Sequence, residues 1–162
     1  MSTKEKLLLK RLDTIISEKP LVICIGNELR GDDGAGIIFG QNLLNGGYEN
    51  TILVFDTPEN YLQKIISMPG RCRLWVDVIN WGANPGSYNI LAPTEVQHFA
   101  ISTHNYSPVV LLEFLKTYQD IPDYFLGIQP QDLSLGNQIT QPVSNTIKRL
   151  SEFFLRSAQR TK

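Results

Sequence analysis

The hydrophobic positions of the chain follow two alternating spacings. Within residues 4–18, apolar side chains recur at the spacing of one face of an α-helix. They are Leu8, Leu12, Ile15 and Ile16. We expect this helix to end before Pro20, because the residue that precedes a proline avoids the helical conformation. Residues 21–25 are then continuously apolar and rich in β-branched side chains, which predicts a strand buried in a parallel sheet.

Strand and helix patterns alternate from there to the end of the chain. Further strands are predicted at residues 51–55, 73–79, 87–91 and 124–128. Further helices are predicted over residues 37–44, from Thr57-Pro58 to about residue 68, from Ser107-Pro108 with Leu111, Leu115 and Tyr118 on one face, and from Gln141-Pro142 with Val143, Ile147, Leu150 and Phe154 in phase. Proline suits the first turn of a helix, and it stands at three of these starts. The pattern predicts an α/β fold, a three-layer sandwich with a mostly parallel, five-stranded twisted sheet and helices on both faces.

Length and continuity predict one domain. The chain has 162 residues, close to the usual size of a domain, and no linker, repeat or low-complexity tract divides it. We therefore expect a single domain over residues 1–162. Within it, residues 1–20 form an appended N-terminal helix, and residues 21–155 form the core.

Composition narrows the class of protein. Hydrophobic residues make up 42% of the chain and charged residues 19%, which excludes a disordered protein. The net charge is −1, so the basic excess typical of nucleic-acid binding is absent. The apolar run at 21–25 is far shorter than the ~20 residues of a membrane span. Residues 2–19 are too charged for a signal peptide, so we expect a cytoplasmic protein that binds neither nucleic acid nor membrane.

Candidate chemistry gathers at one edge of the predicted sheet. Ligands of open α/β sheets bind beyond the carboxyl ends of the strands. Asp33 follows the first strand, Asp77 lies near the end of the third, and His104 precedes a helix. Taken singly, Asp33 is also compatible with a helix N-cap and Asp77 with a structural hydrogen-bonding role, and a lone His104 is more typical of an ordinary loop histidine. Together, two carboxylates and an imidazole predict a site for a divalent transition metal with open coordination positions.

Other motifs point to weaker alternatives. The glycines of residues 31–36 stand in G-x-x-G-x-G order, the reverse of the dinucleotide fingerprint. Asp32 and Asp33 would also repel a pyrophosphate, which makes a nucleotide-binding domain the less favoured interpretation. The two cysteines, Cys24 and Cys72, are too few and too far apart for a disulfide scaffold or a Cys-based zinc site.

Four segments carry a resemblance to a known family. In chain order they are Gly-Asn-Glu-Leu-Arg-Gly-Asp-Asp-Gly-Ala-Gly at 26–36, Val76-Asp77 with Asn84-Pro85-Gly86 downstream, Thr103-His104-Asn105, and Phe-Leu-Gly-Ile-Gln-Pro at 125–130. In this order they resemble the maturation endopeptidases of [NiFe] hydrogenases, in the branch that serves the hydrogenase 3 type of large subunit. The resemblance spans residue 21 to about residue 155.

The resemblance implies an aspartic-type or metal-dependent endopeptidase. Its partner would be the nickel-loaded large-subunit precursor of a [NiFe] hydrogenase, from which it removes a C-terminal extension. Asp33, Asp77 and His104 would be both the catalytic residues and the ligands of the nickel, which is recognised in the substrate. Other divalent cations such as cadmium or zinc would be able to occupy the same site.

Two segments depart from the family pattern. The second strand is followed by Asp56-Thr57-Pro58-Glu59 where family members have Asp-Gly-Gly, and the helix at 4–18 is unusual. The segment 127–130 is compatible with a peptide groove and equally with a tight exit from the last strand. The alternative function is a non-catalytic nickel-binding or nickel-sensing module on the same fold.

Overall fold

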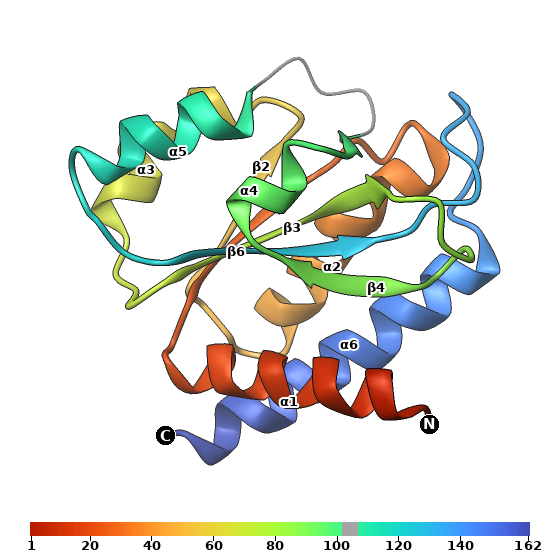
Figure 1. Ribbon diagram of the computed structural model, residues 1–162, viewed down its shortest axis with the longest axis horizontal. Coiled ribbons are helices and arrows are strands. Elements are labelled where there is room, and N and C mark those ends of the chain that lie inside the picture. The colour runs from red at the N-terminus through yellow and green to blue at the C-terminus, as the bar shows by residue number, and fades with distance from the viewer. Residues whose placement is uncertain (102–106) are drawn as a thin grey trace.

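Five strands form the main sheet, in the order β2-β1-β3-β6-β4 (Figure 1). The structure is a computed structural model that describes residues 1–101 and 107–162. The strands are β1 (Leu21–Ile25), β2 (Thr51–Phe55), β3 (Arg73–Asn80), β4 (Tyr88–Leu91) and β6 (Asp123–Ile128). All run parallel to their neighbours except β4, which pairs antiparallel with β6. The predicted α/β fold with a mostly parallel sheet is confirmed.

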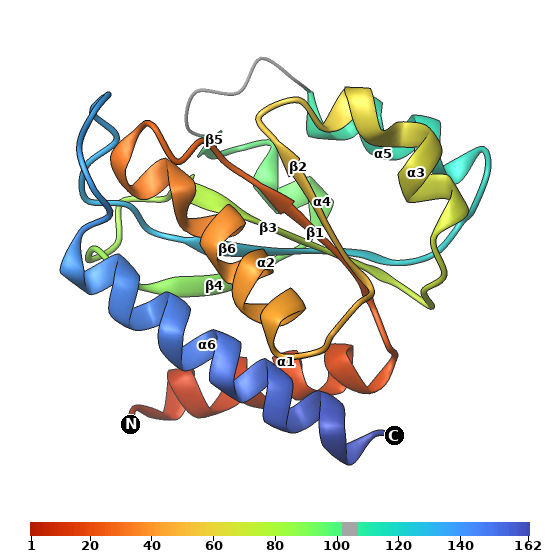
Figure 2. The ribbon, with the colours of Figure 1, turned by 180° about the vertical axis from the view of Figure 1, so that it is seen from behind.

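Helices cover both faces of this sheet (Figures 1 and 2). One face carries α1 (Thr3–Ser17), α2 (Ala35–Asn45) and α6 (Gln141–Arg160); the other carries α3 (Leu62–Ser67), α4 (Pro93–Val96) and α5 (Pro108–Lys116). Two 3-10 turns, η1 (Gly31–Gly34) and η2 (Pro58–Tyr61), precede α2 and α3. Successive strand residues point to opposite faces. Accordingly, Val22 and Cys24 of β1 lie in the α1/α2/α6 core, while Ile23 lies in the α3/α4/α5 core.

Several local features differ from the prediction: α4 was not predicted, and the helix expected from Thr57-Pro58 to about residue 68 is η2 followed by α3. A two-residue strand, β5 (Ala100–Ile101), pairs antiparallel with the end of β3, and so short an element sets no periodic pattern in the sequence. The expectation that Tyr118 shares the buried face of α5 is wrong, because its side chain is 59% exposed. The N–H and the hydroxyl of Thr117 both bond the carbonyl of Phe114, so the helix ends before Tyr118.

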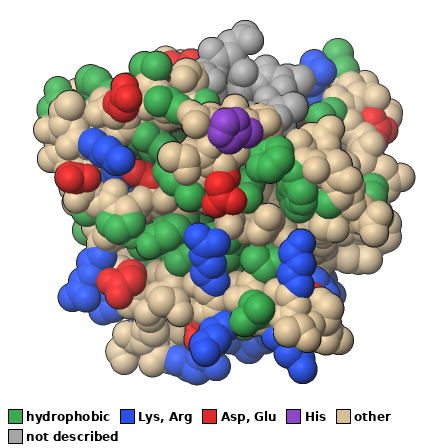
Figure 3. Space-filling view, viewed as in Figure 1, with side chains coloured by type: hydrophobic (Ala, Val, Ile, Leu, Met, Phe, Trp, Pro, Cys, Tyr) green, Lys and Arg blue, Asp and Glu red, His purple; other side chains and the backbone are tan. Residues whose placement is uncertain are grey.

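The N-terminal helix α1 packs into the same core as α2 and α6. Its buried side chains are Leu12, Ile15 and Ile16. The guanidinium of Arg11 donates to the carbonyl of Ile90 in β4 at 2.9 Å. Lys and Arg side chains gather over α1 and α6 in the lower part of Figure 3. Among the described residues, no helix combines the length and the hydropathy needed to cross a bilayer.

A buried ion pair joins the amino ends of β3 and β6. Arg73 donates from Nε and Nη2 to the two carboxylate oxygens of Asp123, at 2.7 and 3.0 Å. The indole N–H of Trp75 donates to the same carboxylate at 2.8 Å. Because Arg73 and Asp123 also face each other in the strand pairing, this cluster fixes the register of the two strands. Arg73 lies at the amino end of β3, four residues before Asp77, and the cluster carries no part of the predicted site.

Candidate active site

Asp33 is held where β1 turns into α2. The carbonyl oxygen of Asp33 accepts a hydrogen bond from the N–H of Asn27 at 3.0 Å, and the N–H of Gly26 donates to Phe55 of β2 at 2.9 Å. A Cβ atom on Gly26 would lie 2.2 Å from the Asp33 carbonyl oxygen, so only glycine allows this approach. The backbone of Asp33 is thereby fixed against the carboxyl end of β1, and its side chain is fully buried.

Gly36 brings the start of α2 onto two strands at once. A Cβ atom there would lie 2.2 Å from the carbonyl oxygen of Ile25 in β1 and 2.6 Å from that of Val76 in β3. Asp77 directly follows Val76, and η1, which carries Asp33, contacts β3. The structure therefore brings the segments of Asp33 and Asp77 together at the carboxyl edge of the sheet, as the sequence predicts.

Asp77 is itself almost fully buried, with 1% of its surface exposed. Its Oδ1 accepts a hydrogen bond from the N–H of Val78 at 2.7 Å. Across the strand pair it faces Gly127 of β6, where a Cβ atom would lie 2.9 Å from Cδ1 of Ile79. A carboxylate in such surroundings is stabilised only by donors or a cation.

The carboxylate of Asp32 joins two loops at this edge. Its buried carboxylate accepts hydrogen bonds from the N–H groups of Gln131, Asp132 and Thr140 and from the Thr140 hydroxyl, at 2.7–2.9 Å. These donors all belong to the loop that follows β6. Asp32 thus ties the loop after β1 to the loop after β6.

Gln129, which directly follows β6, bonds the end of β3 and the loop after it. Its side-chain oxygen accepts from the N–H groups of Trp81 and Ala83, at 2.9 and 3.2 Å, and its amide nitrogen donates to Asn80 at 2.9 Å. The segment 127–130 is therefore a hydrogen-bonded strand exit that clamps the loop after β3. In the sequence, Gln129 is the residue of this segment whose side chain can both donate and accept hydrogen bonds.

The backbone N–H groups of the 31–33 turn all form hydrogen bonds within the protein. The N–H groups of Gly31, Asp32 and Asp33 donate to the carbonyls of Asn137, Asp132 and Arg30, at 2.8–3.1 Å. Phosphate-binding loops instead offer such groups to the ligand. Together with the two buried carboxylates, this argues against the nucleotide-binding alternative.

His104 lies outside the described residues, so the three-residue site stays a prediction. Among the residues that the structure describes, no group of three or more His, Cys, Asp or Glu side chains is arranged to hold a metal ion. Asp56, at the end of β2, is exposed. His98, the histidine inside the described part of the chain, is an exposed residue after α4.

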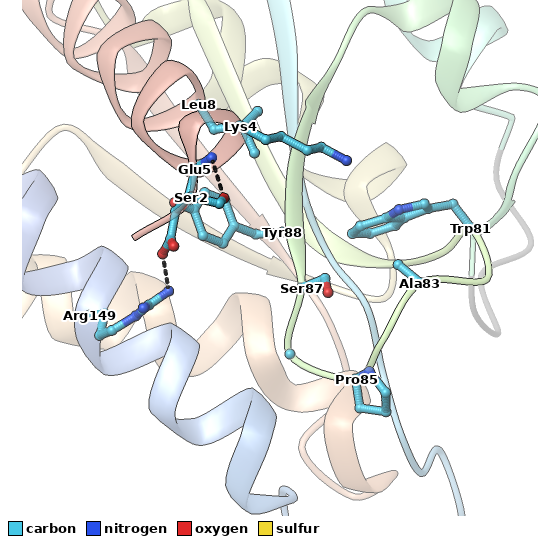
Figure 4. Close-up of a pocket in the computed structure, with 11 residues that line it drawn as sticks. Ser2, Lys4, Glu5, Leu8, Trp81, Ala83, Pro85, Ser87, Tyr88 and Arg149 are labelled. Atoms are coloured by element: carbon cyan, nitrogen blue, oxygen red, sulfur yellow. Dashed lines mark hydrogen bonds and ion pairs between the residues drawn. The ribbon is translucent and has the colours of Figure 1, made fainter.

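A pocket of about 380 Å³ lies beside this edge, between the loop after β3 and the amino end of α1 (Figure 4). Lys4 extends across it toward Trp81, and Glu5 pairs with Arg149 of α6 at 2.8 Å. The Tyr88 hydroxyl is buried and, within the described part of the chain, has no hydrogen-bond partner. Burial raises the pKa of Tyr88 to about 12, with Glu5 adding to the shift and Arg149 opposing it.

Comparison with known proteins identifies the family. The sequence model of the hydrogenase maturation protease family matches residues 42–157. The chain belongs to this family. The matched range includes Asp77 and His104, while Asp33 precedes it. The resemblance to hydrogenase maturation endopeptidases is confirmed, and the protein is a hydrolase of the protease class.

Individual relatives agree with this assignment. The hydrogenase 3 maturation protease of Escherichia coli K12 is 31% identical over 132 residues, which cover 79% of this chain and 83% of that protein. The crystal structure of a [NiFe] hydrogenase maturation protease, HycI from Thermococcus kodakarensis KOD1, superposes with a TM-score of 0.82 at 25% identity. That match covers 92% of this chain and 99% of the other. The hydrogenase maturating endopeptidase HybD from E. coli shares the fold, with a TM-score of 0.70 at 20% identity over 86% of this chain and 91% of that one.

Proposed function

We propose that the protein removes the C-terminal extension of a nickel-loaded [NiFe] hydrogenase large-subunit precursor. The observation that carries this proposal is the burial of two carboxylates, Asp33 and Asp77, on segments that meet at one sheet edge in a member of this protease family. We also propose that the reaction takes place in the cytoplasm, the compartment favoured by the charged segment 2–19.

The site recognises the precursor by its nickel. In this proposal Asp33, Asp77 and His104 are its ligands on the protease, and cadmium or zinc can take its place. Two carboxylates and one imidazole suit a divalent transition metal and leave positions for the substrate's own ligands. Asp33 stands just ahead of α2, where the helix dipole favours a negative charge.

Recognition of the metal couples loading to cleavage. A precursor without nickel lacks the central contact, so its scissile bond is not held near the site. With nickel present, Asp33, Asp77 and His104 orient the bond for attack by water, and orientation of this kind contributes strongly to rate. When bound, the metal supplies Lewis acidity, and a carboxylate at the site can take the proton of the water as general base. The catalytic type is thus aspartic or metal-dependent, with the same three residues in both cases.

Mass spectrometry of a large-subunit precursor tests the proposal. The precursor is incubated with the protein, with and without nickel, and its mass is measured. We expect shortening at the C-terminus only in the nickel-loaded sample. A precursor that binds but keeps its full mass would instead indicate the non-catalytic nickel-binding module.

A variant of His104 tests the site. His104→Ala is expected to abolish both processing and nickel binding, while its circular dichroism spectrum stays that of the wild type. Undiminished processing by this variant would remove His104 from the site and leave the protease activity standing.

A further inference from the structure

Two exposed leucines stand on the loops that border Asp33. Leu29 lies in the turn after β1, and Leu135 lies in the loop after β6. Their side chains are 69% and 70% exposed. A single exposed leucine is common on protein surfaces and needs no explanation. Here two of them stand on segments that a backbone hydrogen bond joins next to the candidate site, and we call this pair the Leu29/Leu135 ridge.

The backbone beneath this ridge is joined by several hydrogen bonds. The N–H of Gly136 donates to the carbonyl of Leu29 at 2.8 Å, so the two leucine-bearing segments are direct neighbours. The N–H of Gly31 donates to Asn137 at 3.1 Å, and that of Asp32 to Asp132 at 2.8 Å. The two loops are thereby paired along their length, although about a hundred residues separate them in the sequence.

Side chains lock the same pairing. The Asp32 carboxylate accepts hydrogen bonds from the N–H groups of Gln131, Asp132 and Thr140. Gly31 has a positive φ of 55°, and a Cβ atom on it would lie 2.5 Å from the Asp132 carbonyl oxygen. The turn that carries Leu29 is itself closed by the Asn27 side chain, which accepts from the N–H of Leu29 at 3.0 Å. The leucines are therefore presented from a preorganised frame.

We propose that the Leu29/Leu135 ridge docks apolar side chains of the precursor polypeptide next to the bond that is cleaved. The proposal rests on the proposed function, since it names where that substrate is held. Asp33 lies four residues after Leu29 in the same turn, and its N–H bonds the carbonyl of Arg30 at 3.1 Å. A polypeptide held for cleavage at Asp33 therefore lies next to the turn that carries Leu29. Apolar anchors on a preorganised frame bind without the entropy cost of ordering a loop.

Kinetics of three substitutions test the ridge. Leu29→Ser and Leu135→Ser are each expected to raise KM for the nickel-loaded precursor about tenfold with little change in kcat, because a buried leucine contact contributes to ground-state binding. Leu29→Met keeps the volume and the apolar character, and we expect a KM within about twofold of the wild type. Leu7→Ser is the matched control, because Leu7 is 63% exposed on α1, away from these loops.

Binding is measured separately with the wild-type His104 in place, by surface plasmon resonance with a nickel-loaded precursor whose scissile bond carries a substitution that blocks cleavage. In this measurement, Leu29→Ser is expected to raise the Kd for the precursor about tenfold. Wild-type KM and Kd in both serine variants would overturn the ridge while leaving the proposed function intact. Failure of the wild type to shorten the precursor would refute the proposed function, and the Kd comparison would still decide the ridge. Thermal melting of each variant confirms that its fold is retained.

Discussion

Replacing Asp32 with asparagine tests whether this carboxylate holds the two edge loops together. The side chain is fully buried, and its two oxygens accept three backbone N–H groups and one hydroxyl. Asparagine has the same shape but only one acceptor oxygen. Oδ2 bonds both Gln131 and Asp132, so the amide oxygen is best placed there. The new NH₂ group then faces the N–H of Thr140, and two donors oppose each other.

The expected loss in the free energy of unfolding follows from these bonds. One backbone N–H left without an acceptor costs about 1–3 kcal/mol. The remaining bonds to the side chain lose their charge-assisted strength, which adds about 1 kcal/mol or more. We therefore expect Asp32→Asn to lower the free energy of unfolding by about 3 kcal/mol. For a chain of this length, that corresponds to a fall of about 6–12 °C in Tm.

Urea denaturation, followed by tryptophan fluorescence, measures this loss. An unchanged m-value would show that the unfolding transition still exposes the same surface. Hydrogen exchange supplies a local readout, since the amides of Gln131, Asp132 and Thr140 should exchange faster in the variant. Asp120→Asn is the control, because Asp120 is exposed, and it should change stability by less than about 0.5 kcal/mol. A loss below about 1 kcal/mol for Asp32→Asn, with unchanged exchange at the three amides, would refute the reasoning.

Two further predictions concern buried polar groups. Tyr88→Phe should leave stability unchanged or raise it by up to about 1 kcal/mol in urea denaturation, because the Tyr88 hydroxyl has no partner in the described part of the chain; a clear loss would show that the hydroxyl is bonded. Burial raises the pKa of the Cys72 thiol to about 11, with Glu18 and Asp123 adding to the shift and Arg73 opposing it. Since the unfolded chain loses this proton near pH 9 and the folded chain only near pH 11, stability should fall as pH rises through this window. Cys72→Ala should flatten that fall, and an equally steep decline in the variant would assign it to other groups.

Local patterns in the sequence determine most of the elements of this fold. The apolar run at 21–25 becomes β1, and the helical stripe at 4–18 becomes α1, each within a residue of its expected limits. Hydrophobic periodicity suffices here, because each element buries the face that the pattern marks. The same patterns, with the rule that ligands bind beyond the carboxyl ends of parallel strands, place Asp33 and Asp77 at one edge.

Tertiary structure alone decided how the edge is held together. Asp32 and Asp33 are indistinguishable by type and position in the sequence, yet Asp32 bonds a loop 99–108 residues away. Gln129 clamps Trp81 across 48 residues, and Arg73 pairs with Asp123 across 50. Periodicity reports only which face of an element is buried. It contains no information on which distant donor meets which acceptor, because that depends on how the packed strands bring their loops together.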